Sequence, residues 1–216
     1  MGHRTTEWQL KGYLMGSKMQ TGLLLILGTI VSLVGWMAIY PGDDSATAES
    51  AAALMADPTL AKLGMLMGFG GMGAVFIGFL NISRKMAAGD GAGSSYANIS
   101  AIMAMTLVVM LAIGLSIEWA VTEASDATEG ASLMLHSAAL ETPFNLAGGL
   151  LMVLLGIGII LEKNFHIIIG GLAVVAGACF LLGNVDALED VGGFIGWIGL
   201  MLVALALGVQ TIRSKN

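Results

Sequence analysis

Six continuous apolar stretches, each about 20 residues long, constrain this chain more than any other feature of its sequence. A stretch of that length spans roughly 30 Å of hydrocarbon as an α-helix. A barrel strand needs only about half as many residues and alternates apolar with polar side chains, which these runs do not. The sequence therefore predicts one all-α membrane domain over residues 1–216, a bundle of six transmembrane helices. The predicted helices cover residues 21–40, 60–82, 99–121, 144–161, 165–183 and 191–212.

Composition supports this class of protein. Hydrophobic residues make up 56% of the chain and charged residues 11%, and the mean hydropathy is +0.86. A soluble domain carries about 25% charged residues, so the lipid bilayer is the predicted surrounding of this chain. Nucleic acid is not a predicted partner, because the net charge is −6 and no basic cluster stands out.

The basic residues predict the orientation in the membrane. Cytoplasmic loops carry an excess of lysine and arginine, and of the nine such residues only Lys62 falls on the opposite side from the rest. Lys62 begins the second predicted helix, from which its ammonium can reach the headgroups. Both termini are therefore predicted to be cytoplasmic, in a multi-pass protein of the cell (inner) membrane. The residues on the cytoplasmic side are Arg4, Lys11, Lys18, Arg84, Lys85, Lys163, Arg213 and Lys215.

Two short surface helices are predicted in the longer outer connections. The first connection is rich in helix formers and contains Asp43 and Asp44, which are candidate caps. The second has Asp126 three residues before Glu129, a spacing typical of a helix start. These connections cover residues 41–59 and 122–142.

Each outer connection ends in a capping residue followed by proline. Asp57-Pro58 precedes the second predicted transmembrane helix, and Thr142-Pro143 precedes the fourth. Proline is favoured in the first turn of a helix, directly after a side chain that caps the free amides. The two helices are therefore predicted to start in the same way.

Glycines are predicted to hold the bundle together. Apolar side chains gain little by leaving lipid for another helix, so close backbone approach has to supply the packing. Leucine at Gly68 or Gly196 is expected to destabilise the protein more than leucine at Ala204, which is expected to face lipid. The predicted helix-packing residues are Gly64, Gly68 and Gly71 in the second helix and Gly192, Gly196 and Gly199 in the sixth.

Several turn and packing motifs follow one another in a characteristic order. The first half contains Pro41-Gly42-Asp43-Asp44, Thr47-Ala48, Asp57-Pro58 and Leu63-Gly64. The second half contains Gly158, Lys163, Gly170-Gly171 and Ala176-Gly177. This order resembles a prokaryotic six-helix integral membrane family that is catalogued only as a domain of unknown function. His166 departs from the pattern, since the family often has proline there. The resemblance implies the architecture and brings no activity, cofactor or catalytic residue.

Ionisable groups at membrane depth usually mark a functional site in a membrane protein. The nearest such group is Glu118, three residues from the outer end of the third predicted helix and beside Trp119. Tryptophan is enriched at the membrane interface. Glu118 is therefore interpreted as a carboxylate at headgroup level, with a proton-relay or substrate-binding role as the alternative.

The histidines do not form a metal or haem site on this topology. His136 falls in an outer connection, whereas His3 and His166 are on the cytoplasmic side, about one bilayer thickness away. The single cysteine, Cys179, has no partner for a disulfide or a thiolate metal site. No metal and no cofactor is predicted.

The acids before the sixth helix are the remaining metal candidates. Asp186, Glu189 and Asp190 have a spacing that could gather oxygen ligands for calcium. Acids at a helix N-terminus are also explained by the helix dipole without an ion. No specific cation site is predicted there.

The sequence contains no paired nucleophile and base, and the glycine run Gly68–Gly73 lies inside a predicted membrane helix. An enzyme is therefore disfavoured. A structural or accessory component is predicted, with other membrane subunits or a second copy of the chain as partners. The alternative is a transporter or carrier of a small apolar solute or lipid. A flat apolar outer surface with a tight interior would favour the structural role, and a cavity lined by Asn81, Asn145, Thr106 or Ser116 would favour the carrier.

Overall fold

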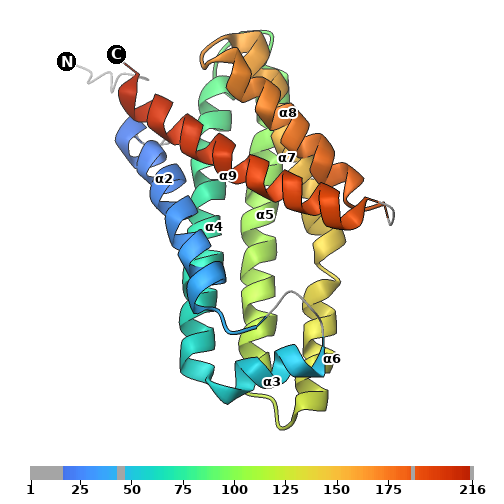
Figure 1. The fold of residues 1–216 in the computed structure, drawn as a ribbon. Coiled ribbons are helices and arrows are strands. Elements are labelled where there is room, and N and C mark those ends of the chain that lie inside the picture. Colours follow the sequence, from blue (N-terminus) through green and yellow to red (C-terminus); the bar gives the residue numbers. More distant parts are fainter. Residues whose placement is uncertain (1–16, 43–46, 186–187, 215–216) are drawn as a thin grey trace, which may run out of the picture.

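The computed structural model describes residues 17–42, 47–185 and 188–214, which form helices joined by short turns (Figure 1). No strand occurs in these three ranges, so the all-α prediction is confirmed for them. The helices are α2 (Lys18–Val34), which continues as the π-helical turn η1 (Gly35–Ile39), α3 (Ala48–Ala56), α4 (Pro58–Ala87), α5 (Ser94–Val121), α6 (Ala127–Ala138), α7 (Glu141–Glu162), α8 (Ile167–Leu182) and α9 (Glu189–Arg213).

Five helical segments in the described part of the chain are long and apolar enough to cross a membrane. They cover residues 18–39, 58–87, 94–121, 127–162 and 191–213. The remaining predicted span forms α8, which has 16 residues. At 1.5 Å per residue α8 is about 24 Å long, shorter than the roughly 30 Å of a hydrocarbon core. The chain thus has the helices of a multi-pass membrane protein, and a sixth crossing stays a prediction.

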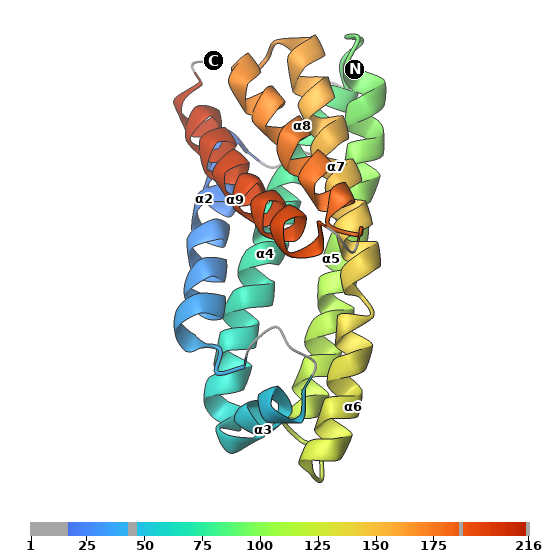
Figure 2. The same ribbon diagram turned by 45° about the vertical axis from the view of Figure 1, so that its right-hand side comes forward.

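Six helices form a ring in which each packs against two neighbours. The order around the ring is α2, α4, α5, α7, α8 and α9, and α9 packs back against α2. Figures 1 and 2 show α9 running obliquely across the bundle, so that its first turns lie part-way along α4 and α5. The interior of the ring is filled by buried side chains, among them Phe76, Phe79, Leu151, Leu155 and Leu207.

The bundle has two distinct ends. At one, which we call the terminal end, the Lys18 ammonium donates to the Ser214 carbonyl oxygen at 3.4 Å. The turn between α4 and α5 is fastened at the same end, because the Gly93 amide donates to Glu162 Oε1 at 2.8 Å. A β-carbon on Gly93 would lie 2.6 Å from the Gly158 carbonyl oxygen, so this close approach requires glycine. The opposite end, with α3 and α6, is the loop end (Figure 1).

The two predicted surface helices are present at the loop end, as α3 and α6, and they pack against each other. Thr47 Oγ1 caps α3 by accepting from the Ser50 amide at 3.1 Å, whereas the predicted caps Asp43 and Asp44 lie outside the described residues. Asp126 caps α6 through the Glu129 amide at 2.9 Å, as predicted. A small apolar cluster lies beneath both helices: Ala51, Leu54, Ala61, Met65, Val121 and Met134.

Hydrogen bonds at the start of α6 lower the pKa of Glu129. The Ser125 hydroxyl and amide both donate to Glu129 Oε2, at 2.6 Å and 2.8 Å. These two hydrogen bonds stabilise the charged form and hold the pKa of Glu129 below its ordinary value.

Only one of the two predicted cap-and-proline starts is correct. Asp57 Oδ1 accepts from the Leu60 amide at 2.9 Å and begins α4. Thr142 does not cap α7, because that helix already begins at Glu141. Leu140, the residue before it, has helical backbone angles, and Pro143 falls within the first turn, where its missing N–H is not needed. As a result α6 and α7 run on almost continuously over residues 127–162.

The six predicted packing glycines all lie against a neighbouring helix or the turn that follows one. A β-carbon on Gly64 would lie 2.7 Å from Tyr40 Cα, and one on Gly71 would lie 2.7 Å from the Gly28 carbonyl oxygen. The α9 glycines face α8 and the residue after it: Gly192 lies against Gly183, Gly196 against Phe180 and Gly199 against Ala176. How much these approaches stabilise the bundle stays a prediction.

Candidate functional site

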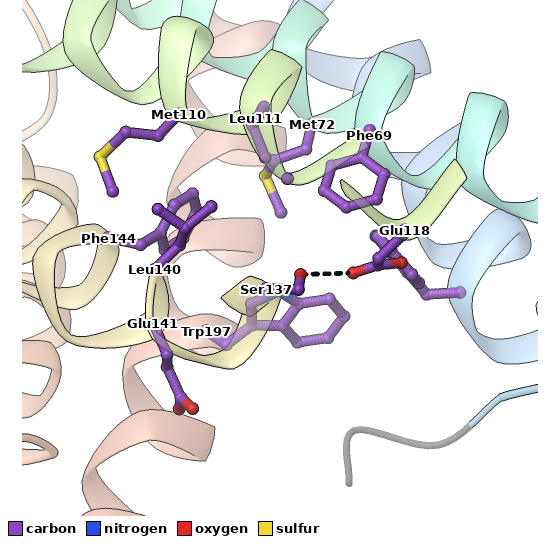
Figure 3. Close-up of a pocket in the computed structure, with 12 residues that line it drawn as sticks. Phe69, Met72, Met110, Leu111, Glu118, Ser137, Leu140, Glu141, Phe144 and Trp197 are labelled. Atoms are coloured by element: carbon purple, nitrogen blue, oxygen red, sulfur yellow. Dashed lines mark hydrogen bonds between the residues drawn. The ribbon is translucent and has the colours of Figure 1, made fainter. Parts of the chain in front are cut away.

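An open pocket of about 240 Å³ lies between the helices in the half of the bundle toward the loop end, and Figure 3 shows its lining residues. Its walls come from η1, α4, α5, α9 and the junction of α6 with α7. We call it the Glu118 pocket. The residues that line it are Trp36, Phe69, Met72, Met110, Leu111, Gly114, Glu118, Ser137, Leu140, Glu141, Phe144 and Trp197.

Glu118 is the polar centre of this pocket. Its Oε1 accepts from Ser137 Oγ at 3.1 Å, the contact drawn in Figure 3. Its Oε2 accepts from the Tyr40 hydroxyl at 2.9 Å. Tyr40 follows η1 and Ser137 is on α6, so one carboxylate joins three elements that are far apart in sequence.

Aromatic rings form the wall next to Glu118. The Trp36 ring meets both Phe69 and Tyr40 edge to face, with centroids 4.8 Å apart in each pair. Gly68 leaves the space for this arrangement, since a β-carbon there would lie 2.6 Å from Trp36 Nε1. The π-helical turn at Gly35–Ile39 changes the direction of the side chains after α2. Such turns are frequent at functional sites.

The rest of the pocket is apolar, except at its rim. Figure 3 shows Met110, Leu140 and Phe144 together, away from Glu118. Gly114 leaves space in the pocket, because a β-carbon at this position would lie 3.2 Å from Phe69 Cε1, which belongs to the opposite part of the lining. Glu141, an exposed residue, adds a second carboxylate to the lining. None of the described residues that line the pocket is basic.

Lys62, the one basic residue predicted on the outer side, is engaged elsewhere at the loop end. Its ammonium lies 2.8 Å from Glu123 Oε1 and 4.8 Å from the centre of the Trp119 ring. The hydrogen bond and the charge of Lys62 hold the pKa of Glu123 below its ordinary value. Trp119 therefore contacts Lys62, while its neighbour Glu118 lines the pocket.

The polar residues that the sequence suggested for a cavity do not line this one. Thr106 and Ser116 each donate to a carbonyl oxygen of their own helix, at 3.1 Å and 2.8 Å. Asn81 donates to Thr21 Oγ1 at 3.3 Å, and Asn145 is buried. The Glu118 pocket is therefore not the polar-lined cavity that would have favoured a carrier on sequence grounds. The sequence did single out Glu118, but nothing in it signalled Tyr40 or Ser137 as partners.

The metal candidates are not brought together in the described part of the chain, where no group of three or more His, Cys, Asp or Glu side chains could hold an ion. His136 Nδ1 lies 2.7 Å from the Ser132 carbonyl oxygen on α6, and His166 caps α8 at the terminal end. His3 and Asp186 lie outside the described residues. The glycine run Gly68–Gly73 lies within α4, as predicted.

A second hollow, of about 670 Å³, lies between α2 and α4 on the outside of the bundle. Its lining is apolar apart from Ser17 and Gln20, and it contains no charged side chain among the described residues. In a membrane protein such a groove is covered by lipid. Of these two hollows, the Glu118 pocket is therefore the candidate functional site, because charged side chains belong to its lining.

The chain matches no protein-family model, no curated protein and no solved structure. The resemblance to a six-helix family of unknown function accordingly stays a prediction.

Proposed function

We propose that this protein binds a small, largely apolar solute in the Glu118 pocket and acts as its carrier or membrane-embedded binding protein. One observation carries the proposal: an open pocket with apolar walls and a single half-buried carboxylate lies between apolar helices that are long enough to span a membrane. Ligand sites have this general form, with few polar groups that fix the orientation of an apolar body. The cavity of about 240 Å³ exceeds the roughly 150 Å³ that suffices to hold benzene.

The structural or accessory role predicted first from the sequence is the competing proposal. It predicts a tightly packed interior and a stable protein partner. The pocket favours the carrier, because its lining combines apolar side chains with a hydrogen-bonded carboxylate, as ligand sites do.

The experiment is gentle purification from native membranes, followed by mass spectrometry of copurifying small molecules and proteins. The matched variant is Gly114→Leu, which places a side chain into the pocket. Its control is Gly73→Leu on α4, since a β-carbon on Gly73 would meet nothing within 4 Å. A small molecule that copurifies with the wild type and with Gly73→Leu, but not with Gly114→Leu, supports the proposal. A stoichiometric protein partner with no small molecule would support the structural role instead.

We also propose six crossings of the inner membrane with both termini in the cytoplasm. The bond between Lys18 and Ser214 supports an even number of crossings, because the two ends of the described chain meet at one end of the bundle. Of the described basic residues only Lys62 lies toward the loop end, which supports a cytoplasmic terminal end.

Cysteine labelling tests this topology in a Cys179→Ser background. Cysteines at Ser50 and Thr128 should react with a membrane-impermeant maleimide in intact cells, and a cysteine at Gly89 should not. Val185, which follows α8 and is 51% exposed, decides the number of crossings. Labelling of a cysteine at Val185 supports six crossings, whereas its protection would mean that α8 and α9 form a hairpin that does not reach the outer side.

A further inference from the structure

The Glu118 pocket is open on one side of the bundle. At the terminal end α9 packs against α2, where a β-carbon on Gly208 would lie 3.0 Å from the Gly22 carbonyl oxygen, and from there α9 crosses to α8. Toward the loop end no extensive packing joins η1 to α7 or α9 in the described part of the chain. Figure 1 shows α5 between α2 and α6, uncovered by any described helix below α9. Trp36 of η1, Trp197 of α9 and Phe144 of α7 belong to the lining, so the pocket opens sideways between these three elements.

The lining changes from polar to apolar with distance from the loop end. Glu118 follows Met110 on α5, which runs toward the loop end, so it lies about 12 Å nearer that end at 1.5 Å per residue. On the opposite wall Ser137 and Glu141 come before Phe144, in helices that run away from the loop end. A lipid leaflet has the same arrangement, with polar groups at its surface and hydrocarbon beneath.

The surfaces beside the opening are apolar. Met37, next to Trp36 on η1, is 77% exposed, and Phe194, one turn before Trp197 on α9, is 67% exposed. Both lie in segments that are apolar enough to cross a membrane. Large exposed apolar surfaces mark contact with lipid or with a partner. In a membrane the opening therefore leads into hydrocarbon.

We infer that the occupant of the Glu118 pocket is a membrane-dissolved amphiphile with a single chain and a hydroxyl-bearing head, which enters sideways from the leaflet at the loop end. The chain lies along Met110 and Phe144, and the head lies near Ser137 and Glu141. The Ser137 hydroxyl donates its proton to Glu118, and its oxygen and the Glu141 carboxylate are acceptors for hydroxyl groups of the head. This inference rests on the proposed function, because it names the class of solute for the same site.

The size of the pocket requires that a long chain leave it through the opening. A cavity of roughly 150 Å³ holds benzene, so the pocket of about 240 Å³ takes only part of a stearoyl chain. The remainder extends into the bilayer, where it keeps its contacts with lipid. An enclosed pocket of this volume would reject such a chain, so binding of a stearoyl amphiphile is itself evidence of the side opening.

The test measures quenching of tryptophan fluorescence by bromine in vesicles of dioleoylphosphatidylcholine. The full chain carries Trp8→Phe and Trp119→Phe, which leaves Trp36 and Trp197, both in the pocket lining. The probe is a monoacylglycerol with a 6,7-dibromostearoyl chain. Phosphatidylcholine with the same brominated chain, at an equal content of brominated chains, measures the quenching that bulk lipid causes. The monoacylglycerol should associate roughly 10-fold more strongly than this lipid, the factor expected from one or two hydrogen bonds to its head.

Two variants make the result specific to the pocket. Gly114→Leu fills the pocket and should remove the excess quenching by the monoacylglycerol, leaving only the quenching by bulk lipid. Gly73→Leu adds the same side chain on α4, where a β-carbon would meet nothing within 4 Å, and should keep the excess. Unbrominated monoacylglycerol should compete with the probe. A thermal melt of each variant shows that the fold is retained.

The outcomes separate this inference from the function beneath it. 4-Bromobenzyl alcohol, which fits the pocket without a chain, is measured in parallel. If it quenches in a way that Gly114→Leu abolishes, while the monoacylglycerol quenches no more than the brominated lipid, the amphiphile is overturned and the binding function stands. Excess quenching by the monoacylglycerol that survives Gly114→Leu would also overturn the inference. Failure of both probes would count against the inference and the proposed function together.

Discussion

Adjacent glycines on α4 offer a sharp test of how the helices are held together. Gly71 is buried against α2: a β-carbon there would lie 2.7 Å from the Gly28 carbonyl oxygen and 2.8 Å from Ser32 Cα. Gly70 is exposed, and a β-carbon there would meet nothing within 4 Å. Gly70→Ala and Gly71→Ala are therefore the same chemical change one residue apart, with opposite surroundings.

The magnitude follows from two terms. Alanine in place of glycine favours a helix interior by about 0.5–1 kcal/mol, and this gain is common to both variants. Only Gly71→Ala has to push α2 away, at an overpacking cost of about 1–3 kcal/mol. The difference between the variants should equal that cost, since the helix term cancels. For a chain of this size it corresponds to roughly 2–12 °C in melting temperature.

The assay is thermal unfolding of the detergent-solubilised variants side by side. Gly70→Ala should melt at or slightly above the wild-type temperature, and Gly71→Ala clearly below Gly70→Ala. Equal melting of the two variants would refute the argument, because it would mean that the close approach of α4 and α2 contributes nothing to stability.

Two further predictions concern carboxylates at the ends of the bundle. The hydrogen bond and the charge of Lys62 lower the pKa of Glu123. The stabilisation from this pair is therefore present above the unfolded pKa and is lost as the pH falls through the lowered pKa of the folded protein. NMR titration should show the Glu123 midpoint rise in Lys62→Met, and an unchanged midpoint would contradict the assigned cause. At the terminal end, Glu162→Ala removes the acceptor of the Gly93 amide and should cost about 1–2 kcal/mol. Hydrogen exchange at Gly93 should accelerate in Glu162→Ala and less in Glu162→Gln, and equal protection in all three proteins would show that the contact does not hold the turn.

Much of the helical content could be predicted from the sequence, because it depends on local properties. Long apolar runs are read directly from hydropathy, and the Asp57 cap of α4 is a local hydrogen bond next to a proline. The start of α7 could not be predicted from its local signal. Thr142-Pro143 resembles a helix start, but the chain was already helical one turn earlier, after α6.

It was harder to predict which face of a helix packs against another helix. Nearly all side chains in these spans are apolar, so the sequence does not distinguish the buried face from the lipid-facing one. Ala204, expected to face lipid, is fully buried, so that expectation was wrong. Gly70 is the better choice of an exposed control because the structure shows open space around it.

The pocket could be predicted only in part. Glu118 is recognisable as an ionisable residue near the end of an apolar span. Its partners Tyr40 and Ser137 reach it only because α4, α5 and the surface helix α6 pack together at the loop end. Contacts made by such distant segments are set by tertiary packing, which no local pattern encodes. The same holds for Trp197, which α9 brings to the pocket from near the other end of the chain.

The most direct measurement is an experimental structure of the protein with 4-bromobenzyl alcohol, in which the bromine is located by its anomalous scattering. The account predicts a bromine peak inside the Glu118 pocket, near Met110 and Phe144, with the hydroxyl group of the probe within hydrogen-bond distance of Glu118. A peak only in the external groove between α2 and α4, or no peak with the pocket empty, would contradict the claim that this protein binds a small solute at Glu118.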